Sequence, residues 1–251
     1  MFTEERALWI YKHYLWLERH LPQRQKKGPA VFVTPHKQFF PATWQPTHDC
    51  AKQVFDRIRE LMGISNWPCS LKAKDGLRSS RANFDGEHKS SGAAGTFQAT
   101  HENQVIITYA VDMLEDPIGY VATMAHELCH YLLAQIAEGP PCTWQHLEPL
   151  TDLTSVIEGF GIFATNSHFN FGQWTNHSHQ GWSTRTVGYL NEAELGFATA
   201  IFCIRNRLDP KIPADLLKLN PREVFVDALD FIIELEANNS PSRSTPKVTA
   251  F

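Results

Sequence analysis

The feature that most constrains this chain is an apolar helix interrupted by polar side chains, within the segment VATMAHELCHYLLAQ (121–135). Asp116-Pro117 is a helix-start signal, because aspartate caps free amides and proline fits the first helical position. Gly139-Pro140-Pro141 is a stop signal for the same helix. Three ionisable residues lie inside it: His126, Glu127 and His130. Burying such groups costs free energy unless they have partners, so the pattern predicts that they serve a purpose.

The two histidines are spaced as ligands of one metal ion. On a helix, side chains four residues apart are stacked at about 5–6 Å between their Cβ atoms. Two imidazoles at that spacing can bind one tetrahedral zinc ion. Glu127 is turned by about 100° around the helix axis, so it does not readily act as a third ligand with them. It can instead reach a water molecule on the metal and act as general base and then general acid.

A third ligand is expected in the stretch HLEPLTDLTSVIEGFGIF (146–163), which predicts a second helix from about Pro149 to Ala164. Glu148 and Asp152 lie four residues apart at its start. One carboxylate can bind zinc, while the other accepts a hydrogen bond from the far nitrogen of a liganding histidine. Because Pro149 disfavours helical backbone at the preceding residue, we expect Glu148 to be an N-cap residue.

Several ligand assignments remain open at this stage. Either Glu148 or Asp152 can be the third ligand. Cys50 or Cys69 would be the ligand in a deformylase-like site, but the motif that accompanies such a cysteine is absent. Glu158 is expected to pack or cap rather than to bind metal.

The arrangement of HELCH followed by Glu148 and Asp152 resembles the gluzincin (thermolysin-type) zinc metallopeptidases over residues 117–165. The resemblance implies a zincin-like fold, Glu148 as the third zinc ligand and Asp152 as the partner of a histidine, expected to be His126. The second half of the chain also looks similar to uncharacterised bacterial HExxH proteins, through the segments TDLTSVIEGFGIFATN and GYLNEAELGFATAIF.

The same resemblance implies two further features of a peptidase site. Residues 107–110 would be the edge strand of the sheet, with which a peptide substrate pairs. A downstream tyrosine or histidine would donate a hydrogen bond to the oxyanion. The candidates are His168, His177, His179, Arg185 and Tyr189; we favour Tyr189, His177 and His179.

The hydrophobic pattern predicts an α+β fold with a small mixed sheet, the motif helix and then a helical C-terminal lobe. The resemblance to gluzincins implies that this fold is zincin-like. Residues 1–236 would form one domain, divided into an α/β lobe (about 1–138) and a helical lobe (about 139–236), before a disordered tail at 237–251. Further helices are expected at 3–20, 47–62, 188–208 and 221–236, strands at the start of 30–41 and at 104–110, and a hairpin or mobile loop at 72–103.

Composition excludes several classes of function. The formal net charge is −4 and no basic stripe is present, so the sequence predicts no nucleic-acid partner. No window of about 18 apolar residues exists, so no membrane span is expected. The five cysteines are irregularly spaced and include no CxxC pair, which favours a reducing, cytoplasmic location.

These observations predict a zinc metallohydrolase, most simply a peptidase that acts on a peptide or protein. The rival hypothesis is a binding or regulatory module of zincin fold whose metal is structural, with the fourth metal position filled by His177, His179 or a cysteine. A third hypothesis is a protease restrained by its own residues 72–103 or by its C-terminal tail. The sequence leaves the substrate and the oligomeric state open.

Overall fold

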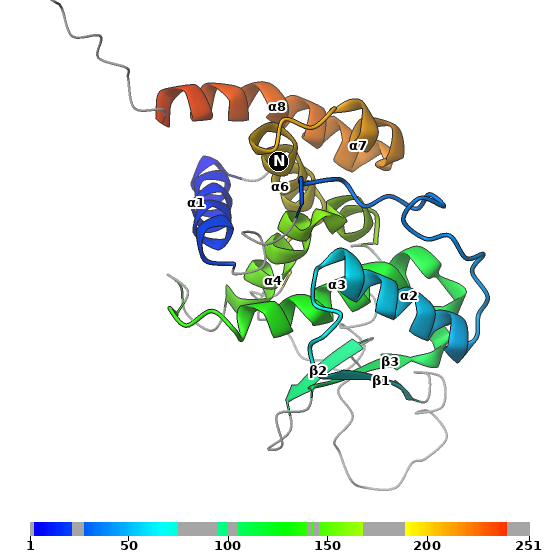
Figure 1. The fold of residues 1–251 in the computed structure, drawn as a ribbon. Helices are drawn as coiled ribbons and strands as arrows, with labels where there is room; N and C mark the ends of the chain where they lie inside the picture. The colour runs from blue at the N-terminus through cyan, green and yellow to red at the C-terminus, as the bar shows by residue number, and fades with distance from the viewer. Residues whose placement is uncertain are drawn as a thin grey trace, which may run out of the picture.

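The computed structural model describes residues 3–21, 28–74, 95–99, 105–139, 142, 146–167 and 189–239. Within them the fold is α+β, mostly helical with one small sheet, as expected from the sequence (Figure 1). None of the helices in these segments is both long and apolar enough to cross a membrane.

The sheet has three strands in the order β1-β3-β2: β1 (Cys69–Lys74), β2 (Gly95–Ala99) and β3 (Val105–Ala110). β1 is parallel to β3, and β2 is antiparallel to it with Gly95 opposite Tyr109, so the sheet is mixed. The prediction of an edge strand at 107–110 is wrong, because β3 is the central strand. β3 pairs with a strand on each side, and Ile107 and Tyr109 on one of its faces are fully buried.

The motif helix, α3 (Pro117–Leu133), packs against β2 and β3 of the sheet and also contacts α2 (His48–Leu61) and α4 (Leu147–Ser155) (Figure 1). Its start is as predicted: the Asp116 side chain accepts a hydrogen bond from the amide of Gly119 at 3.0 Å. A 3₁₀ turn, η2 (Val111–Glu115), connects it to β3. Every residue from Gly119 to Cys129 is buried, which is typical of a central helix surrounded by protein.

α4 (Leu147–Ser155) crosses next to α3 and begins two residues earlier than predicted. A π turn, η4 (Val156–Phe160), then interrupts the predicted continuous helix before it resumes at 161–167. Gly159 adopts φ +97°, and a Cβ atom there would lie 2.5 Å from the carbonyl oxygen of Val31. The Gly159 carbonyl accepts a hydrogen bond from the amide of Val33.

That contact explains why the strand predicted at the start of 30–41 does not form. Residues 31–34 have no regular secondary structure; Val31 and Val33 lie against the π turn, and the segment is not part of the sheet. Tertiary context thus decides the structure of an apolar run that sequence periodicity assigns to a strand.

The other helices are close to expectation: α1 (Glu4–His20), α2 (His48–Leu61), α6 (Glu192–Arg205), the unpredicted short α7 (Lys211–Leu216) and α8 (Leu219–Asn239). α1 packs on α4 and α6 although it precedes the sheet in the sequence. Ion pairs connect Arg6 with Glu194 at 2.7 Å and Arg205 with Glu18 at 2.6 Å. α8 continues through 237–239, where a disordered tail was predicted. The rest of that tail lies outside the described residues, as do 75–94 and 100–103 of the predicted loop.

Candidate metal centre

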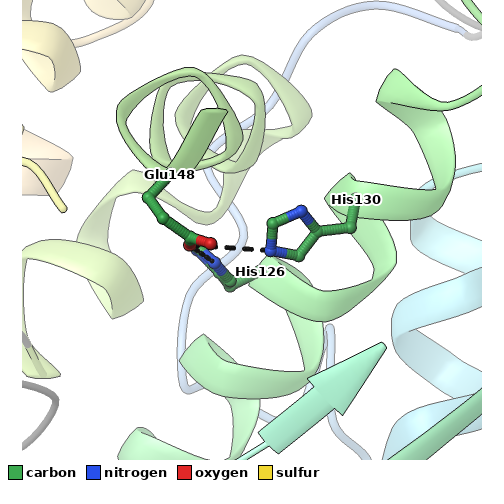
Figure 2. A group of neighbouring side chains, drawn as sticks. All are labelled: His126, His130 and Glu148. Carbon is green, nitrogen blue, oxygen red and sulfur yellow. Dashed lines mark hydrogen bonds and ion pairs between the residues drawn. The ribbon is translucent and has the colours of Figure 1, made fainter. Parts of the chain in front are cut away.

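α3 presents His126 and His130 on one side, one helical turn apart, with ring centroids 4.9 Å from each other. His126 is buried, whereas the His130 side chain keeps 15% of its surface exposed. Both rings point toward the first turn of α4, where Glu148 projects back at them (Figure 2). The side chains that sequence spacing assigned to one metal site are therefore brought together.

The donor atoms of this group converge at distances that suit a metal ion. The Oε2 atom of Glu148 lies 3.0 Å from the Nε2 atom of His126 and 3.6 Å from the Nε2 atom of His130. One donor atom from each of the three residues lies within 4.8 Å of the other two. Donors bonded to a tetrahedral zinc ion at about 2.0–2.1 Å lie roughly 3.3 Å apart, so the observed spacings bracket the expected value.

Glu148 is helical rather than an N-cap residue, which corrects the expectation drawn from Pro149. α4 begins at Leu147, with His146 in the N-cap position. Proline is tolerated in the first helical turn because the amide it lacks would have no helical acceptor there. The helical backbone directs the Glu148 carboxylate toward α3, and 35% of its side chain is exposed.

The far nitrogen of each histidine is held by a residue of α4. The Nδ1 atom of His126 donates to Oδ1 of Asp152 at 2.9 Å, and Oδ2 of Asp152 accepts the Leu190 amide at 2.7 Å. The Nδ1 atom of His130 lies 3.2 Å from the Thr151 hydroxyl oxygen. That hydroxyl donates its single proton to the carbonyl of Leu147 at 2.8 Å, so it accepts from His130.

These contacts leave the Nε2 atoms of both histidines directed toward Glu148, as metal ligation requires. They also separate the roles of the two carboxylates. Glu148 faces the Nε2 atoms, whereas Asp152 lies on the Nδ1 side of His126 and is engaged by a backbone amide. The geometry favours Glu148 as the third ligand and Asp152 as the residue that orients His126.

Electrostatics give this group a strong preference for a cation. Burial alone would lower the pKa of His126, but hydrogen bonds with Asp152 and Glu148 raise it to about 10. Although burial opposes it, hydrogen bonds from both histidines hold the pKa of Glu148 far below its usual range. The negative charge that retains a proton on His126 can equally retain a metal cation.

Glu127 lies on the adjoining side of α3 and is 7% exposed. Burial is the largest cause of its raised pKa, which the charges of His126 and His130 partly offset. A raised carboxyl pKa suits a group that takes up and releases a proton near neutral pH. Lys74, at the end of β1, contributes a smaller opposing charge.

Strand β2 lies closer to Glu127 than a side chain at position 95 would allow. A Cβ atom on Gly95 would lie 2.6 Å from Cγ2 of Thr123 and 3.0 Å from Cγ and Oε1 of Glu127. Thr123 cannot easily move, because its hydroxyl donates to the Gly119 carbonyl at 2.9 Å. Gly95 therefore sets the distance between the strand and the proposed base.

Tyr189 is the one favoured downstream donor that the structure describes. Its ring centroid is 5.3 Å from that of His126. Burial, followed by the charges of Glu148 and Asp152, raises the pKa of its hydroxyl, so the hydroxyl stays neutral and can donate. His177 and His179, like His168 and Arg185, lie outside the described residues.

Sequence reasoning missed three contributors: Thr151, the amide of Leu190 and Gly95. Thr151 was predictable, because residues 148, 151 and 152 share one helix face at i, i+3 and i+4. The Leu190 amide and Gly95 had no local signal, since tertiary packing alone brings them to the site. Over the described residues, no fourth histidine, cysteine, aspartate or glutamate joins the group.

Comparison with known proteins adds no relative to this description. No protein-family model matches the chain, and neither does any curated protein or solved structure. The resemblance to gluzincins therefore stays a prediction from the motif, and the function has to be inferred from the geometry of the site.

Proposed function

We propose that this chain is a zinc-dependent hydrolase that cleaves peptide bonds. The observation that carries the proposal is the convergence of both Nε2 atoms and the Glu148 carboxylate. Next to that group stands a buried glutamate with a raised pKa.

His126, His130 and Glu148 would hold the zinc ion. When bound, zinc polarises a carbonyl oxygen and lowers the pKa of water to roughly 7. Glu127 accepts the proton of the attacking water and later donates it to the leaving amine. The neutral hydroxyl of Tyr189 donates a hydrogen bond to the developing oxyanion. Asp152 keeps the His126 ring in its ligating orientation.

A peptide substrate is supported by the position of β2. This strand has one hydrogen-bonded neighbour within the described sheet, β3, and it packs along α3. Gly95 lies against Glu127, and the ring of Phe97 lies 6.2 Å from that of His130. An extended peptide that adds to such an edge gains main-chain hydrogen bonds next to the base.

The test is cleavage of a defined peptide mixture, followed by mass spectrometry of the products, with the zinc-loaded protein and its Glu127→Gln variant. We expect new peptide termini with the wild type and none above background with the variant, which should retain its zinc. Glu115→Gln, at an exposed glutamate away from the site, is the matched control and should cleave normally. Equal cleavage by Glu127→Gln would refute the mechanism. Stoichiometric zinc without any cleavage would support the non-catalytic zincin instead.

A further inference from the structure

The last helix, α8, exposes a line of large apolar side chains. Leu219, Val226 and Ile233 are 66%, 48% and 50% exposed. They are seven residues apart, nearly two helical turns, so they form one line about 21 Å long on the outer side of α8. The opposite side of α8 is buried against the protein through Phe225 and Ile232. Figure 1 shows α8 at the edge of the molecule, beyond α6.

A row of four acidic residues runs beside this apolar line: Glu223, Asp227, Asp230 and Glu234, all exposed. Successive members are four, three and four residues apart, so each has a like charge as its neighbour on the helix surface. Such pairs destabilise a helix. The single basic residue of α8, Arg222, is turned back and donates to the carbonyl of Leu217 at 2.9 Å.

The outer side of α8 thus combines two unfavourable features, exposed apolar area and neighbouring like charges. Both become favourable against a surface that is apolar along one line and basic beside it. A second copy of this chain is disfavoured as the occupant, because an antiparallel pair of α8 helices would bring two acidic rows together. An anionic lipid surface is repelled for the same reason.

We propose that the outer face of α8 binds a basic amphipathic helix of a partner protein. The seven-residue spacing of Leu219, Val226 and Ile233 matches the seam of a pair of packed helices. Lysine or arginine beside the partner's seam would face the acidic row and set its orientation. This inference is independent of the metal centre.

The probe is a fluorescein-labelled synthetic helix of 21 residues, with leucine and isoleucine in its seam and lysine in the flanking positions. Its binding to the full chain is followed by fluorescence anisotropy. We expect saturable binding that weakens at least tenfold in Val226→Ser/Ile233→Ser and at least tenfold in Asp227→Asn/Asp230→Asn. Val111→Ser and Glu115→Gln, at other exposed positions, should bind as the wild type does.

The Asp227→Asn/Asp230→Asn variant shows whether weaker binding could result from unfolding of α8. It removes like-charge neighbours, so α8 should become more stable, and weaker binding cannot then reflect unfolding. Equal binding of a scrambled peptide of the same composition would overturn the proposal, because charge alone would suffice. A concentration-dependent dimer, seen by sedimentation and abolished by Val226→Ser/Ile233→Ser, would also overturn it in favour of a second copy.

Discussion

The two halves of the candidate metal centre are built differently. On one side His126 is buried, and its partner Asp152 is a carboxylate tied to the backbone of a distant segment at Leu190. On the other side His130 is partly exposed, and its partner Thr151 is a neutral hydroxyl tied to its own helix at Leu147. The buried half supplies negative charge, whereas in the other half the side chains of His130 and Glu148 are partly exposed to solvent.

The largest effect on stability and zinc affinity is expected from Asp152→Ala, a change in the buried half of the site. This change leaves the Nδ1 atom of His126 and the Leu190 amide without their acceptor in a buried place. Breaking a buried charged pair costs about 3–5 kcal/mol in the free energy of unfolding. Loss of an orienting partner also weakens metal binding by about 10–100-fold. Urea denaturation measures the first effect and zinc titration the second. A free energy of unfolding within about 1 kcal/mol of the wild type would contradict the account, because ordinary surface substitutions have effects of that size.

The second test is the pH dependence of the metal-free protein. The pKa of His126 is raised to about 10 in the folded state, against about 6.5 in the unfolded chain. The protonated ring therefore stabilises the fold fully below pH 6.5, and this contribution is lost as pH rises toward 10. Stability should fall by about 1.4 kcal/mol per pH unit at most across that window.

Urea denaturation at a series of pH values, in the presence of a chelator, measures this slope. His126→Gln removes the titrating group and should flatten the curve between pH 7 and 9. His48→Gln is the control, because His48 lies outside the site and bonds the Tyr109 hydroxyl. Parallel curves for wild type and His126→Gln would show that the buried half does not hold a proton.

The third test concerns Glu127, which lies between the two histidines in the sequence and faces β2. Gly95→Ala places a methyl group 2.6 Å from Cγ2 of Thr123 and 3.0 Å from the Glu127 side chain. Such overpacking costs about 1–3 kcal/mol. Gly139→Ala is the control, since a Cβ there meets nothing within 4 Å. Thermal unfolding compares them, and an unchanged midpoint for Gly95→Ala would mean that β2 does not touch the base.

The smallest effect is expected in the exposed half. Thr151→Val keeps the shape of the side chain but removes the acceptor of His130. We expect a cost of about 1 kcal/mol in the free energy of unfolding, which is typical of one neutral hydrogen bond. Zinc affinity should fall less than in Asp152→Ala. Thr154→Val is the matched control, since its hydroxyl also bonds a carbonyl four residues earlier on α4 but is remote from His130. Equal losses in Thr151→Val and Asp152→Ala would remove the contrast between the halves.

The sequence predicted those parts of the site that local geometry determines. The start of α3 follows from Asp116 and Pro117, and the pairing of His126 with His130 follows from helical spacing. The approach of α4 was predicted from the carboxylates at 148 and 152. The predicted start of α4 was wrong. Proline disfavours helical backbone at the residue before it, but Pro149 lies in the first turn of α4, where proline is tolerated.

The rest depends on contacts between segments that are distant in sequence. The prediction of the edge strand was wrong because strand order is a tertiary property. β2, which lies in a glycine-rich stretch, is an edge strand of the described sheet, and β3 is the central strand. The segment near Val33 that was expected to be a strand instead donates a hydrogen bond to the π turn at Gly159. No single-sequence pattern reports either arrangement.

The central claim is that His126, His130 and Glu148 bind one zinc ion. The most direct measurement is metal content by inductively coupled plasma mass spectrometry after zinc loading and removal of the excess, on the wild type and on His130→Ala, with His48→Ala as control. The account predicts about one zinc per chain in the wild type and the control, and less than a tenth of that in His130→Ala, as loss of one of three ligands implies. Zinc absent from the wild type, or retained in full by His130→Ala, would contradict it.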